Sequence, residues 1–508
     1  MNCGEWIYKR ALQFSDRPFV KDGDRRLEND DFNRQVNRLA RYLLGLGLKK
    51  GDRVACLLEN SIELLALFFA CAKTGTIFVP LNYRLAVPEL VYMLNDSDPR
   101  LLVSSAVFQP QVQQLQSTHK KIKNYLSVDA GSPEPERNLE TVIAGLDENE
   151  PAGSEEIGPG DPLLLLYTSG STGAPKGALL SHQNVLFSAI HSLVGYGINH
   201  TYKSLIAAPL FHVSALLAGT IPVIYAGGSL VIMKAFNPLE ALDLIEREKI
   251  NYMFAVPVMY QLMTQAGAWE TTDMSHVHFF IAGGASLPVP LIRKYHQEKG
   301  VCFAQGYGMT ETGRLSALGL EDSIRKAGSV GKEVFHVGLR IVDENGRDVP
   351  PGAAGEIVVK GPNVFLGYWN MDEANKAAFR NGWFYTADLG RRDAEGFLYI
   401  IGRKQEMLIF SGENIYPAEI EKAIQGLPAV REVAVVGKKV PKKGDVAVAF
   451  VSLKADNVLT KKELIHSLQG QIADFKIPRE VYFLNELPRN SLDKIDKLAL
   501  KRKLHEYQ

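Results

Sequence analysis

The amino-acid sequence predicts an α/β protein of at least two domains, and three observations support this prediction. With 508 residues, the chain is too long for one ordinary domain. Its N-terminal part alternates segments of helical periodicity with short apolar runs, a pattern that predicts parallel sheets covered by helices. From residue 355 onward, short alternating segments rich in Gly and Val indicate a small β subdomain.

The elements of the N-terminal part follow one another closely. Apolar residues recur at three- and four-residue spacing in residues 36–48 and 62–73, which predicts two helices. The short apolar runs at residues 53–58, 78–81 and 101–103 predict strands between and after them. This alternation favours βαβ units and therefore a sheet of parallel strands.

The middle of the chain continues this pattern after a polar interruption. Residues 131–161 are rich in Pro, Glu, Asp and Gly, which indicates a connection at the surface. Further on, residues 251–254, 256–260 and 279–285 are apolar and predict three successive buried strands. Ser181 precedes an apolar segment and is a candidate helix cap.

Composition and charge narrow the classes of function. Hydrophobic residues make up 46% of the chain and charged residues 22%, as in a globular protein with several cores. The chain has 57 Lys and Arg residues against 57 Asp and Glu residues, so no overall field attracts nucleic acid or an anionic membrane. Small molecules are therefore the favoured partners, and a homodimer stays open.

The cysteines and the apolar runs indicate a reduced, cytoplasmic protein. The longest apolar run, residues 64–72, is too short to span a membrane, and the first residues contain no apolar signal region. We therefore expect a cytoplasmic protein without an integral membrane segment. Four scattered cysteines without metal-ligand spacing are expected to be reduced: Cys3, Cys56, Cys71 and Cys302.

A loop of glycines, hydroxyls and one lysine, residues 167–177, follows the apolar run at residues 163–166. Glycines let backbone N–H groups close on an anion, and hydroxyls and an ammonium group add donors, so the loop predicts a phosphate site. It is not the Walker loop, because Lys176 precedes Gly177 and no Ser or Thr follows. A flexible Gly/Ser linker is the alternative, but a linker seldom follows a buried strand directly.

Two further segments carry chemistry. Residues 305–312 offer Tyr307 for a purine face, the Thr310 hydroxyl for a phosphate and the Glu311 carboxylate for Mg²⁺. Residues 382–390 contain Asp388, whose carboxylate is able to accept hydrogen bonds from both ribose hydroxyls, although alone it reads as a turn residue.

Together these segments resemble the adenylate-forming enzymes, which include acyl-CoA synthetases, aryl-CoA ligases, luciferases and adenylation domains. The resemblance covers nearly the whole chain and is greatest to fatty or aromatic acid–CoA ligases. It implies a large N-terminal domain, residues 1–402, of mixed α/β subdomains plus a small β subdomain. A smaller α+β C-terminal domain, residues 403–508, is then expected to move about a hinge near Gln405.

The resemblance also implies which residues serve ATP, Mg²⁺ and catalysis. Lys494, in the terminal motif of the family, would enter the active site during adenylation, with Thr310 on the α-phosphate and Glu311 on Mg²⁺. The residues implied for nucleotide binding are Thr168, Ser169, Gly170, Ser171, Thr172, Gly173, Lys176, Gly284, Ala285, Gly306, Tyr307, Asp388 and Arg403.

The acid and coenzyme A are assigned in the same way. The substrate pocket implied by the resemblance consists of His212, Val213, Val256, Gly283 and Gly308, and the tunnel for coenzyme A is lined by Ser411, Gly412 and Glu413. Adenylation domains for amino acids commonly place an Asp where this chain has His212. Because a buried ammonium group without a carboxylate partner is costly, amino acids are disfavoured as substrates.

The chain departs from the family pattern at four positions. Ala387 replaces the usual Gly before Asp388, Gln405 replaces an Asp or Lys, Ser411 replaces a Gly, and Asp493 replaces the Gly before Lys494. The last change leaves open a different loop shape or partial pairing of the ammonium group. Lys497 is the alternative catalytic lysine.

The expected function is that of an acyl-CoA synthetase, which adenylates a carboxylic acid with ATP and then forms a thioester with coenzyme A. The pocket segments are apolar, suit a fatty or aromatic acid and offer no anchor for a second charge; a medium- or long-chain fatty acid is favoured. An aryl-acid CoA ligase and a stand-alone enzyme that loads a carrier protein are the alternatives. A non-catalytic nucleotide binder and a hydrolase are disfavoured, since Glu311 and Lys494 are present and no Gly-x-Ser-x-Gly elbow occurs in the loop.

Overall fold

The computed structural model describes residues 2–118, 122–129, 137–151, 156–168, 175–410, 413–440, 444–455, 457–490 and 494–506. By their internal contacts these residues form two compact units. The first unit comprises Met1–Leu339 and Val359–Phe384, and the second comprises Arg340–Val358 and Tyr385–Gln508. Residues 340–358 and 385–402 thus group with the C-terminal part of the chain, whereas the sequence suggested a division after residue 402. The mobile domain and its pivot at Gln405 stay predictions.

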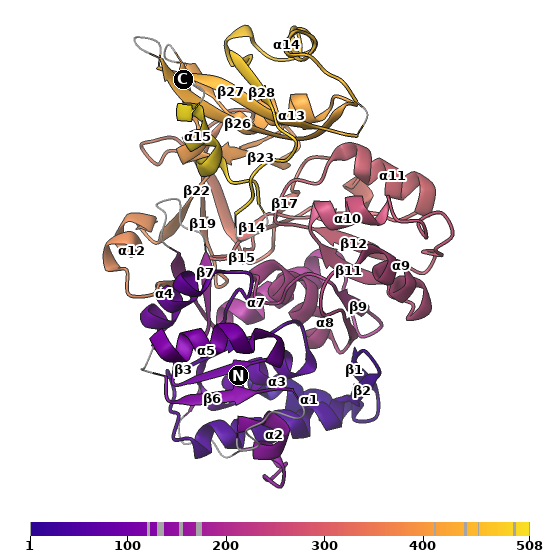
Figure 1. Cartoon of the computed structure of the whole chain (residues 1–508), viewed down its shortest axis with the longest axis vertical. Coiled ribbons are helices and arrows are strands. Elements are labelled where there is room, and N and C mark those ends of the chain that lie inside the picture. Colours follow the sequence, from indigo (N-terminus) through magenta and orange to yellow (C-terminus); the bar gives the residue numbers. More distant parts are fainter. Residues whose placement is uncertain are drawn as a thin grey trace. The chain divides into compact units, whose positions relative to one another are not determined.

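A seven-stranded sheet in the first unit is parallel except at one edge (Figure 1). Its central strands are short and almost entirely buried, as expected when helices cover both faces. The antiparallel pair β1–β2 forms the edge. In spatial order the strands are β13 (Phe303–Gln305), β12 (Phe279–Ala282), β11 (Tyr252–Ala255), β9 (Lys203–Ile206), β10 (Ser229–Ile232), β1 (Pro18–Asp22) and β2 (Arg25–Glu28).

A second seven-stranded sheet carries the strand before the predicted phosphate loop. Five of its strands are parallel, and β8 and β20 extend it in antiparallel fashion. The order is β20 (Gly367–Tyr368), β8 (Lys176–Ser181), β7 (Pro162–Thr168), β4 (Ile77–Pro80), β3 (Arg53–Leu57), β5 (Leu101–Ser104) and β6 (Asn124–Ser127). The predicted parallel sheets and the buried strand at residues 163–166 are confirmed.

Helices pack around these sheets. In α3 (Ile62–Thr74) all thirteen residues are buried, which explains why its sequence is apolar except for Glu63, Lys73 and Thr74. Ser181 caps α7 (His182–Tyr196) and forms a reciprocal capping box with Asn184, as predicted. The others are α1 (Gly4–Phe14), α2 (Asn29–Gly45), α4 (Val87–Ser97), α5 (Gln109–Thr118), α6 (Leu139–Ile143), the π-helix η3 (Ala215–Thr220), α8 (Ile221–Ala226), α9 (Pro238–Arg247), α10 (Pro257–Met263), α11 (Val289–Lys299) and α12 (Asp372–Ala378).

Two sequence-based expectations are wrong. Residues 256–260 do not form a strand, because Val256 caps α10 and Pro257 is its first residue. Proline at the first position of a helix loses no helical hydrogen bond and has a suitable φ. The apolar composition of the segment concealed this helix start. The polar connection at residues 131–161 contains the short helix α6, with Asn138 as its cap.

The second unit contains two β-rich parts. The first is a five-stranded sheet whose strand β21 belongs to the first unit. Its order is β18 (Gly338–Val342), β19 (Gly355–Lys360), β22 (Trp383–Arg392) and β21 (Phe379–Arg380), with β23 (Leu398–Arg403) paired to β22. The chain passes between the units inside β18, β19 and β22. This sheet corresponds to the β subdomain predicted from the Gly- and Val-rich sequence.

The C-terminal part of this unit is a second five-stranded sheet with helices. One apolar core includes Ile415, Ile420 and Ala449, and a second includes Val448 and Leu500. Since successive residues of a strand point to opposite faces, both faces of this sheet are covered. The strands are β25 (Glu413–Ile415), β24 (Leu408–Phe410), β27 (Gly444–Leu453), β26 (Val430–Val440) and β28 (Glu480–Phe483), and the helices are η5 (Lys404–Glu406), α13 (Pro417–Gln425), α14 (Lys461–Leu468), η6 (Asp474–Lys476) and α15 (Lys497–Glu506).

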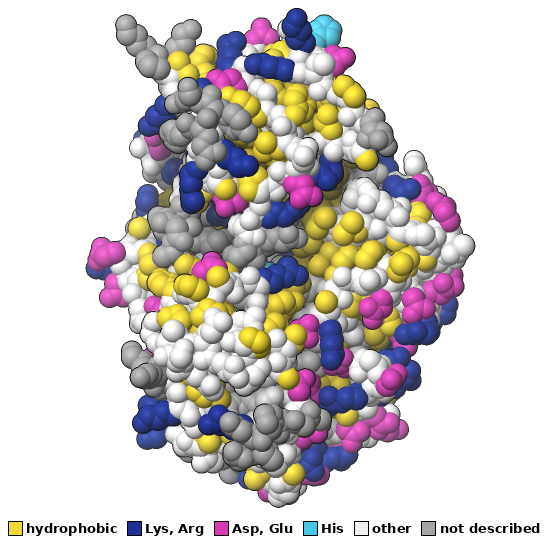
Figure 2. All heavy atoms as spheres, viewed as in Figure 1, with side chains coloured by type: hydrophobic (Ala, Val, Ile, Leu, Met, Phe, Trp, Pro, Cys, Tyr) yellow, Lys and Arg dark blue, Asp and Glu magenta, His cyan; other side chains and the backbone are white. Residues whose placement is uncertain are grey.

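The distribution of charges on the surface and the state of the cysteines agree with the balanced charge and the reduced cysteines expected from the sequence. Basic and acidic side chains are interspersed over the face shown in Figure 2. All four cysteines are free thiols, and three of them are buried. Among the residues that the structure describes, no helix combines the length and the apolar content that crossing a membrane requires.

Candidate active site

The predicted phosphate loop leaves one strand of a hairpin and returns on the next. Thr168 ends β7 and is paired with Lys176, the first residue of β8. The Thr168 hydroxyl donates to the Lys176 carbonyl oxygen over 3.4 Å. These two predicted residues therefore lie side by side at the base of the loop. The other predicted loop residues lie outside the described residues: Ser169, Gly170, Ser171, Thr172 and Gly173.

Three side chains meet beside this base. The Lys176 ammonium group lies 5.2 Å from the centre of the Tyr368 ring, over its face. The Tyr368 hydroxyl donates a hydrogen bond of 2.9 Å to Glu311 Oε1. Glu311 is only 6% exposed. A basic group from the phosphate loop and the carboxylate assigned to Mg²⁺ are thus joined by one tyrosine, which the sequence did not single out.

Thr310 and Glu311 occupy the tip of a tight hairpin between β14 (Gly308–Met309) and β15 (Gly313–Arg314). The Thr312 backbone N–H donates to the Met309 carbonyl over 3.1 Å and closes the turn. At Gly308 an added Cβ would come within 2.0 Å of the Gly313 carbonyl oxygen, so only glycine fits. Gly308, predicted to line the pocket, therefore has a structural reason to be glycine.

Two buried asparagines hold this hairpin in place. Asn363 Nδ2 donates to the carbonyls of Thr312 and Arg314, at 2.6 and 3.2 Å. Asn184, in the first turn of α7, donates over 2.8 Å to each of the carbonyls of Pro362 and Val364. The start of α7 thereby fixes the segment that in turn fixes the Thr310–Glu311 turn. The sequence held no signal for either contact, since lone asparagines are common in loops.

The residues predicted for adenine lie at strand ends of the first sheet. Tyr307 is half-buried, and its backbone N–H donates to Ser316 Oγ over 3.1 Å. Gly306 precedes it directly after β13. Gly284 and Ala285 are exposed and follow β12, where Gly284 has a φ of +80°. Ligands commonly bind outside the carboxyl ends of parallel strands, where these residues lie.

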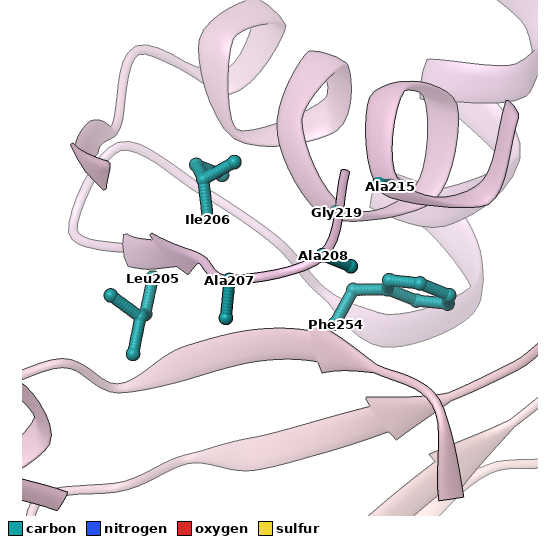
Figure 3. Close-up of a pocket in the computed structure, with 7 residues that line it drawn as sticks. All are labelled: Leu205, Ile206, Ala207, Ala208, Ala215, Gly219 and Phe254. Carbon is teal, nitrogen blue, oxygen red and sulfur yellow. The ribbon is translucent and has the colours of Figure 1, made fainter. Parts of the chain in front are cut away.

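A small apolar pocket lies between the end of β9, η3 and β11 (Figure 3). It is too narrow to hold a water molecule. The lining side chains drawn in Figure 3 consist of carbon only. They come from the end of β9, from η3 and from β11: Leu205, Ile206, Ala207, Ala208, Ala215, Gly219 and Phe254.

Phe254 is wedged between two glycines in this pocket. An added Cβ at Gly219 would lie 2.9 Å from Phe254 Cβ, and one at Gly283 would lie 2.7 Å from Phe254 Cε2. Contacts this short are not tolerated, so both glycines make room for the ring. Gly283 was predicted to line the pocket, whereas Phe254 was read only as part of a buried strand. The sequence gave no sign that Gly219 and Gly283, which are far apart in the chain, both contact the Phe254 ring.

The other predicted pocket residues flank this region. His212 is half-buried, and its ring centre lies 4.4 Å from that of Phe211. Val213 follows it and is also half-buried. Val256 lies against Gly284, where an added Cβ would come within 3.4 Å of Val256 Cγ1. Asn60, which the sequence did not indicate, fixes the preceding segment by hydrogen bonds to Ala208 and Leu210.

The second unit brings together three of the predicted residues. Asp388 and Arg403 pair across the antiparallel strands β22 and β23. Arg403 Nε lies 2.6 Å from Asp388 Oδ1, and the Asp388 side chain is 6% exposed. Desolvation lowers the pKa of Lys494, the positive charge of Arg403 lowers it further, and the negative charge of Asp388 opposes both. The three charges are therefore coupled.

Backbone hydrogen bonds fix the position of Lys494. The Lys494 N–H donates to Asn490 Oδ1 over 3.1 Å, and the Asn490 N–H donates to the Lys494 carbonyl over 2.8 Å. Asp493 lies outside the described residues. The alternative catalytic residue, Lys497, is held by Glu406 at 2.5 Å and by Glu421 at 2.9 Å. Although desolvation alone would lower its pKa, Glu421 and Glu406 raise the pKa of Lys497 above the ordinary value.

The residues on both sides of the predicted hinge are anchored. Lys404 Nζ lies 2.7 Å from Glu356 Oε2 of β19, and Glu406 holds Lys497 at the start of α15. Gln405 lies between them in η5. Glu356 Oε1 also accepts a hydrogen bond of 3.2 Å from the Ala387 N–H. Ala387 itself has a φ of +58°, in the left-handed region that favours glycine.

The predicted tunnel for coenzyme A is described only in part. Ser411 and Gly412 lie outside the described residues. Glu413 begins β25, whose backbone pairs with Phe410 of β24. The tunnel therefore stays a prediction.

The carboxylate of Glu311 is suited to bind a Mg²⁺ ion whose other ligands are phosphate oxygens and water. Among the described residues, no three His, Cys, Asp or Glu side chains gather as a metal cage. Mg²⁺ is usually bound by one or two carboxylates together with substrate phosphates and water, so the single buried carboxylate of Glu311 fits it. Glu311 would hold the ion.

Comparison with known proteins identifies the family. The model of the AMP-binding enzyme family matches residues 7–369, and that of the AMP-binding enzyme C-terminal domain matches residues 419–494. The chain is 39% identical to an indoleacetate–CoA ligase of Aromatoleum aromaticum, over 98% of this chain and 97% of the relative. It is 35% identical to the long-chain-fatty-acid–CoA ligase FadD13 of Mycobacterium tuberculosis, with the same shares of both chains.

A solved structure agrees along the whole chain. The crystal structure of ATP-bound MatB from Rhodopseudomonas palustris superposes with a TM-score of 0.90 at 30% identity and covers 99% of both chains. The predicted α/β architecture and the predicted family are thereby confirmed. The chain belongs to the family of AMP-binding enzymes and is an acid–thiol ligase.

Proposed function

We propose that this chain is an acyl-CoA synthetase that adenylates an apolar carboxylic acid with ATP and then transfers the acyl group to coenzyme A. The observation that carries the proposal is the joining of Lys176 and Glu311 through Tyr368 at the base of the phosphate loop. Held side by side, the Lys176 ammonium group is suited to bind a polyphosphate and the Glu311 carboxylate is suited to bind its metal counter-ion. The relatives named as CoA ligases support the thiol acceptor.

The first half-reaction needs little covalent help from the protein. A carboxylate oxygen of the acid attacks the α-phosphorus of ATP, the bond to the bridging oxygen breaks, and pyrophosphate leaves with the electron pair. Catalysis of such a step rests on position and charge. Thr310 would donate to the α-phosphate and Lys176 would neutralise the departing pyrophosphate. Mg²⁺ held by Glu311 would supply further positive charge.

The second unit would contribute the ribose site and the second lysine. Asp388, aligned by Arg403, would accept hydrogen bonds from the ribose hydroxyls. Lys494 would place its ammonium group on the charge that develops in the transition state. The acyl adenylate is then attacked by the thiol of coenzyme A, and AMP leaves. We expect the two half-reactions to use two orientations of the small domain, with rotation at Gln405.

The predicted pocket segments suit an apolar acid. They are apolar with small residues and offer no anchor for a second charge, so a second carboxylate or an ammonium group would be buried without a partner. A fatty acid of medium or long chain was favoured from the sequence. The Phe254 ring between Gly219 and Gly283 shortens the apolar space and supports an aryl acid as the second candidate. Relatives named for indoleacetate and for long-chain fatty acids represent both classes.

A panel of aliphatic and aryl acids in a pyrophosphate-release assay tests the substrate class. The panel is run with the unaltered enzyme and with Phe254→Leu, which removes most of the ring. If Phe254 limits the pocket, the variant gains activity with longer acids relative to short ones by about tenfold, as expected when several methylene groups become buried. Phe280→Leu is the control, because Phe280 is fully buried on the neighbouring strand and stacks on Tyr260. An equal shift in both variants would contradict the role of Phe254.

The acceptor is tested separately. Purified enzyme is supplied with an accepted acid, ATP and either coenzyme A or a phosphopantetheinyl carrier protein. The proposal requires acyl-CoA to form at the higher kcat/KM. Preferential loading of the carrier would favour the stand-alone adenylating enzyme instead.

A further inference from the structure

We propose that Tyr368 is a positioning residue that holds Glu311 and Lys176 in place for the metal–nucleotide complex. The inference rests on the proposed roles of these two residues. Tyr368 touches them with different parts of its side chain: the hydroxyl group donates to the Glu311 carboxylate, and the ring face lies under the Lys176 ammonium group. One side chain thus sets the positions of an acidic and a basic group at the same site.

The backbone of Tyr368 is itself held firmly. β20 pairs with β8, with Tyr368 opposite Ala178, two residues after Lys176. Asn375 of α12 accepts a hydrogen bond of 2.6 Å from the Tyr368 N–H and donates one of 2.9 Å to its carbonyl. The ring also packs edge-on against Phe365, with a distance of 4.9 Å between ring centres. A tyrosine fixed in this way is suited to orient other groups.

The chemistry of the ring explains why a tyrosine is placed here. The hydroxyl donates to the buried Glu311 carboxylate and fixes its rotation. The ring face attracts the Lys176 ammonium group but cannot take its proton or neutralise its charge. An acidic residue at position 368 would repel Glu311, and an aliphatic one would hold neither group. Tyr368 therefore organises both charges while leaving both intact.

Two substitutions separate the two contacts. Tyr368→Phe removes the hydroxyl and its bond to Glu311 while keeping the ring under Lys176. Tyr368→Leu removes the ring as well and should also release Lys176. The measurement is the calorimetric affinity for α,β-methylene-ATP, which cannot be cleaved at the reacting bond, with and without Mg²⁺. The increase in affinity that Mg²⁺ causes reports on the carboxylate, and the affinity without Mg²⁺ reports on the lysine.

For Tyr368→Phe we expect the Mg²⁺-dependent increase to fall about tenfold, as for loss of a hydrogen bond to a charged group, with the affinity without Mg²⁺ nearly unchanged. For Tyr368→Leu we expect the affinity without Mg²⁺ to fall by about threefold in addition, the scale of a cation–π contact. The control is Tyr482→Phe, which removes a similar hydrogen bond of 2.7 Å to Glu480 in β28. It should change neither affinity.

Glu311→Gln separates this inference from the proposed function. If Glu311→Gln loses the Mg²⁺-dependent increase and Tyr368→Phe retains it, Tyr368 does not position the carboxylate and the inference is wrong. If Glu311→Gln also retains it, the role of Glu311 fails and the inference fails with it. Loss in both single variants, with no further loss in the double variant, supports the inference. An equal loss in Tyr482→Phe would overturn it.

Discussion

Lys494 carries its charge in surroundings that oppose it. Desolvation is the main cause of its lowered pKa, followed by the positive charge of Arg403, and Asp388 only partly compensates. Lys494 nevertheless lies at the exposed surface, so its ammonium group is accessible to a negative group that arrives from a substrate. Lys497, by contrast, is already paired with two carboxylates. This difference supports Lys494 as the catalytic lysine.

Replacing Lys494 by Ala should separate the two half-reactions. Adenylate formation, measured as pyrophosphate release, should be lost, because the negative charge that develops in the transition state loses the cation that Lys494 supplies. Thioester formation from supplied acyl adenylate should continue. Lys497→Ala serves as the comparison and should spare adenylation. Equal loss of both half-reactions in Lys494→Ala would remove the assignment.

The lowered pKa of Lys494 predicts a pH dependence. The ammonium form exists below the pKa, so the rate of adenylation should fall as pH rises through a value below the usual lysine pKa of about 10.4. Lys494→Arg keeps its charge over this range, and its profile should lack the decline. Pyrophosphate release measured from about pH 7 to about pH 10.5 checks this, and an identical decline in both enzymes would contradict it.

Ala387 is a strained residue beside the predicted ribose site. Its φ of +58° costs a residue with a Cβ about 1–2 kcal/mol, and glycine avoids this cost at the expense of some backbone entropy. Ala387→Gly should therefore raise the stability of the second unit by up to about 1 kcal/mol, measured by urea unfolding. Gly352→Ala is the reverse control in the same unit, since Gly352 has a φ of +86° and open space around it. It should lower stability.

At the scale of residues, sequence analysis proposed candidates for the chemistry and missed the residues that contact them. Asp388, Arg403 and Glu311 were proposed because their residue types match the needs of a nucleotide and a metal. Tyr368 and Asn363 act through contacts with residues distant in the chain, and nothing in their local sequence marks such contacts. Ala387 was judged a small change, although its backbone angle shows a real cost.

At the scale of elements, α7 serves the site through its first turn. Asn184 accepts the Ser181 N–H over 2.8 Å and donates to the carbonyls of Pro362 and Val364. One amide group therefore both caps the helix and holds the segment that supports the Thr310–Glu311 turn. Parallel strands and capped helices were predictable from apolar runs and Ser181. The start of α10 was not, because a Pro within an apolar run suits a strand end and a helix start equally.

Asn184→Asp tests this double use. A carboxylate still accepts the Ser181 N–H but cannot donate, so the two carbonyls lose their partners. We expect a loss of stability of about 1–3 kcal/mol and a raised KM for ATP. Ser181→Ala should cost about 1 kcal/mol through the lost cap and leave the KM for ATP nearly unchanged. A raised KM in both variants would show that the effect comes from α7 in general.

At the scale of the whole molecule, the two expected half-reactions demand that the small domain move. Gln405→Pro tests the pivot, because proline fixes φ and restricts the residue before it. The variant should retain one half-reaction and lose the other by at least about tenfold, since one orientation becomes inaccessible. Pyrophosphate release and thioester formation from supplied adenylate are measured in parallel. Unchanged rates of both would place the pivot elsewhere.

The two ion pairs beside Gln405 would restrict the proposed rotation to this residue. Lys404 is tied to β19 through Glu356, and Glu406 is tied to α15 through Lys497. Because both neighbours are held by ion pairs, the change in backbone torsion angles would be concentrated at Gln405 rather than spread over a flexible linker. The rotation would then take place about the backbone of Gln405, and its side chain would make no contact that the rotation requires. An uncharged glutamine would suffice at such a pivot.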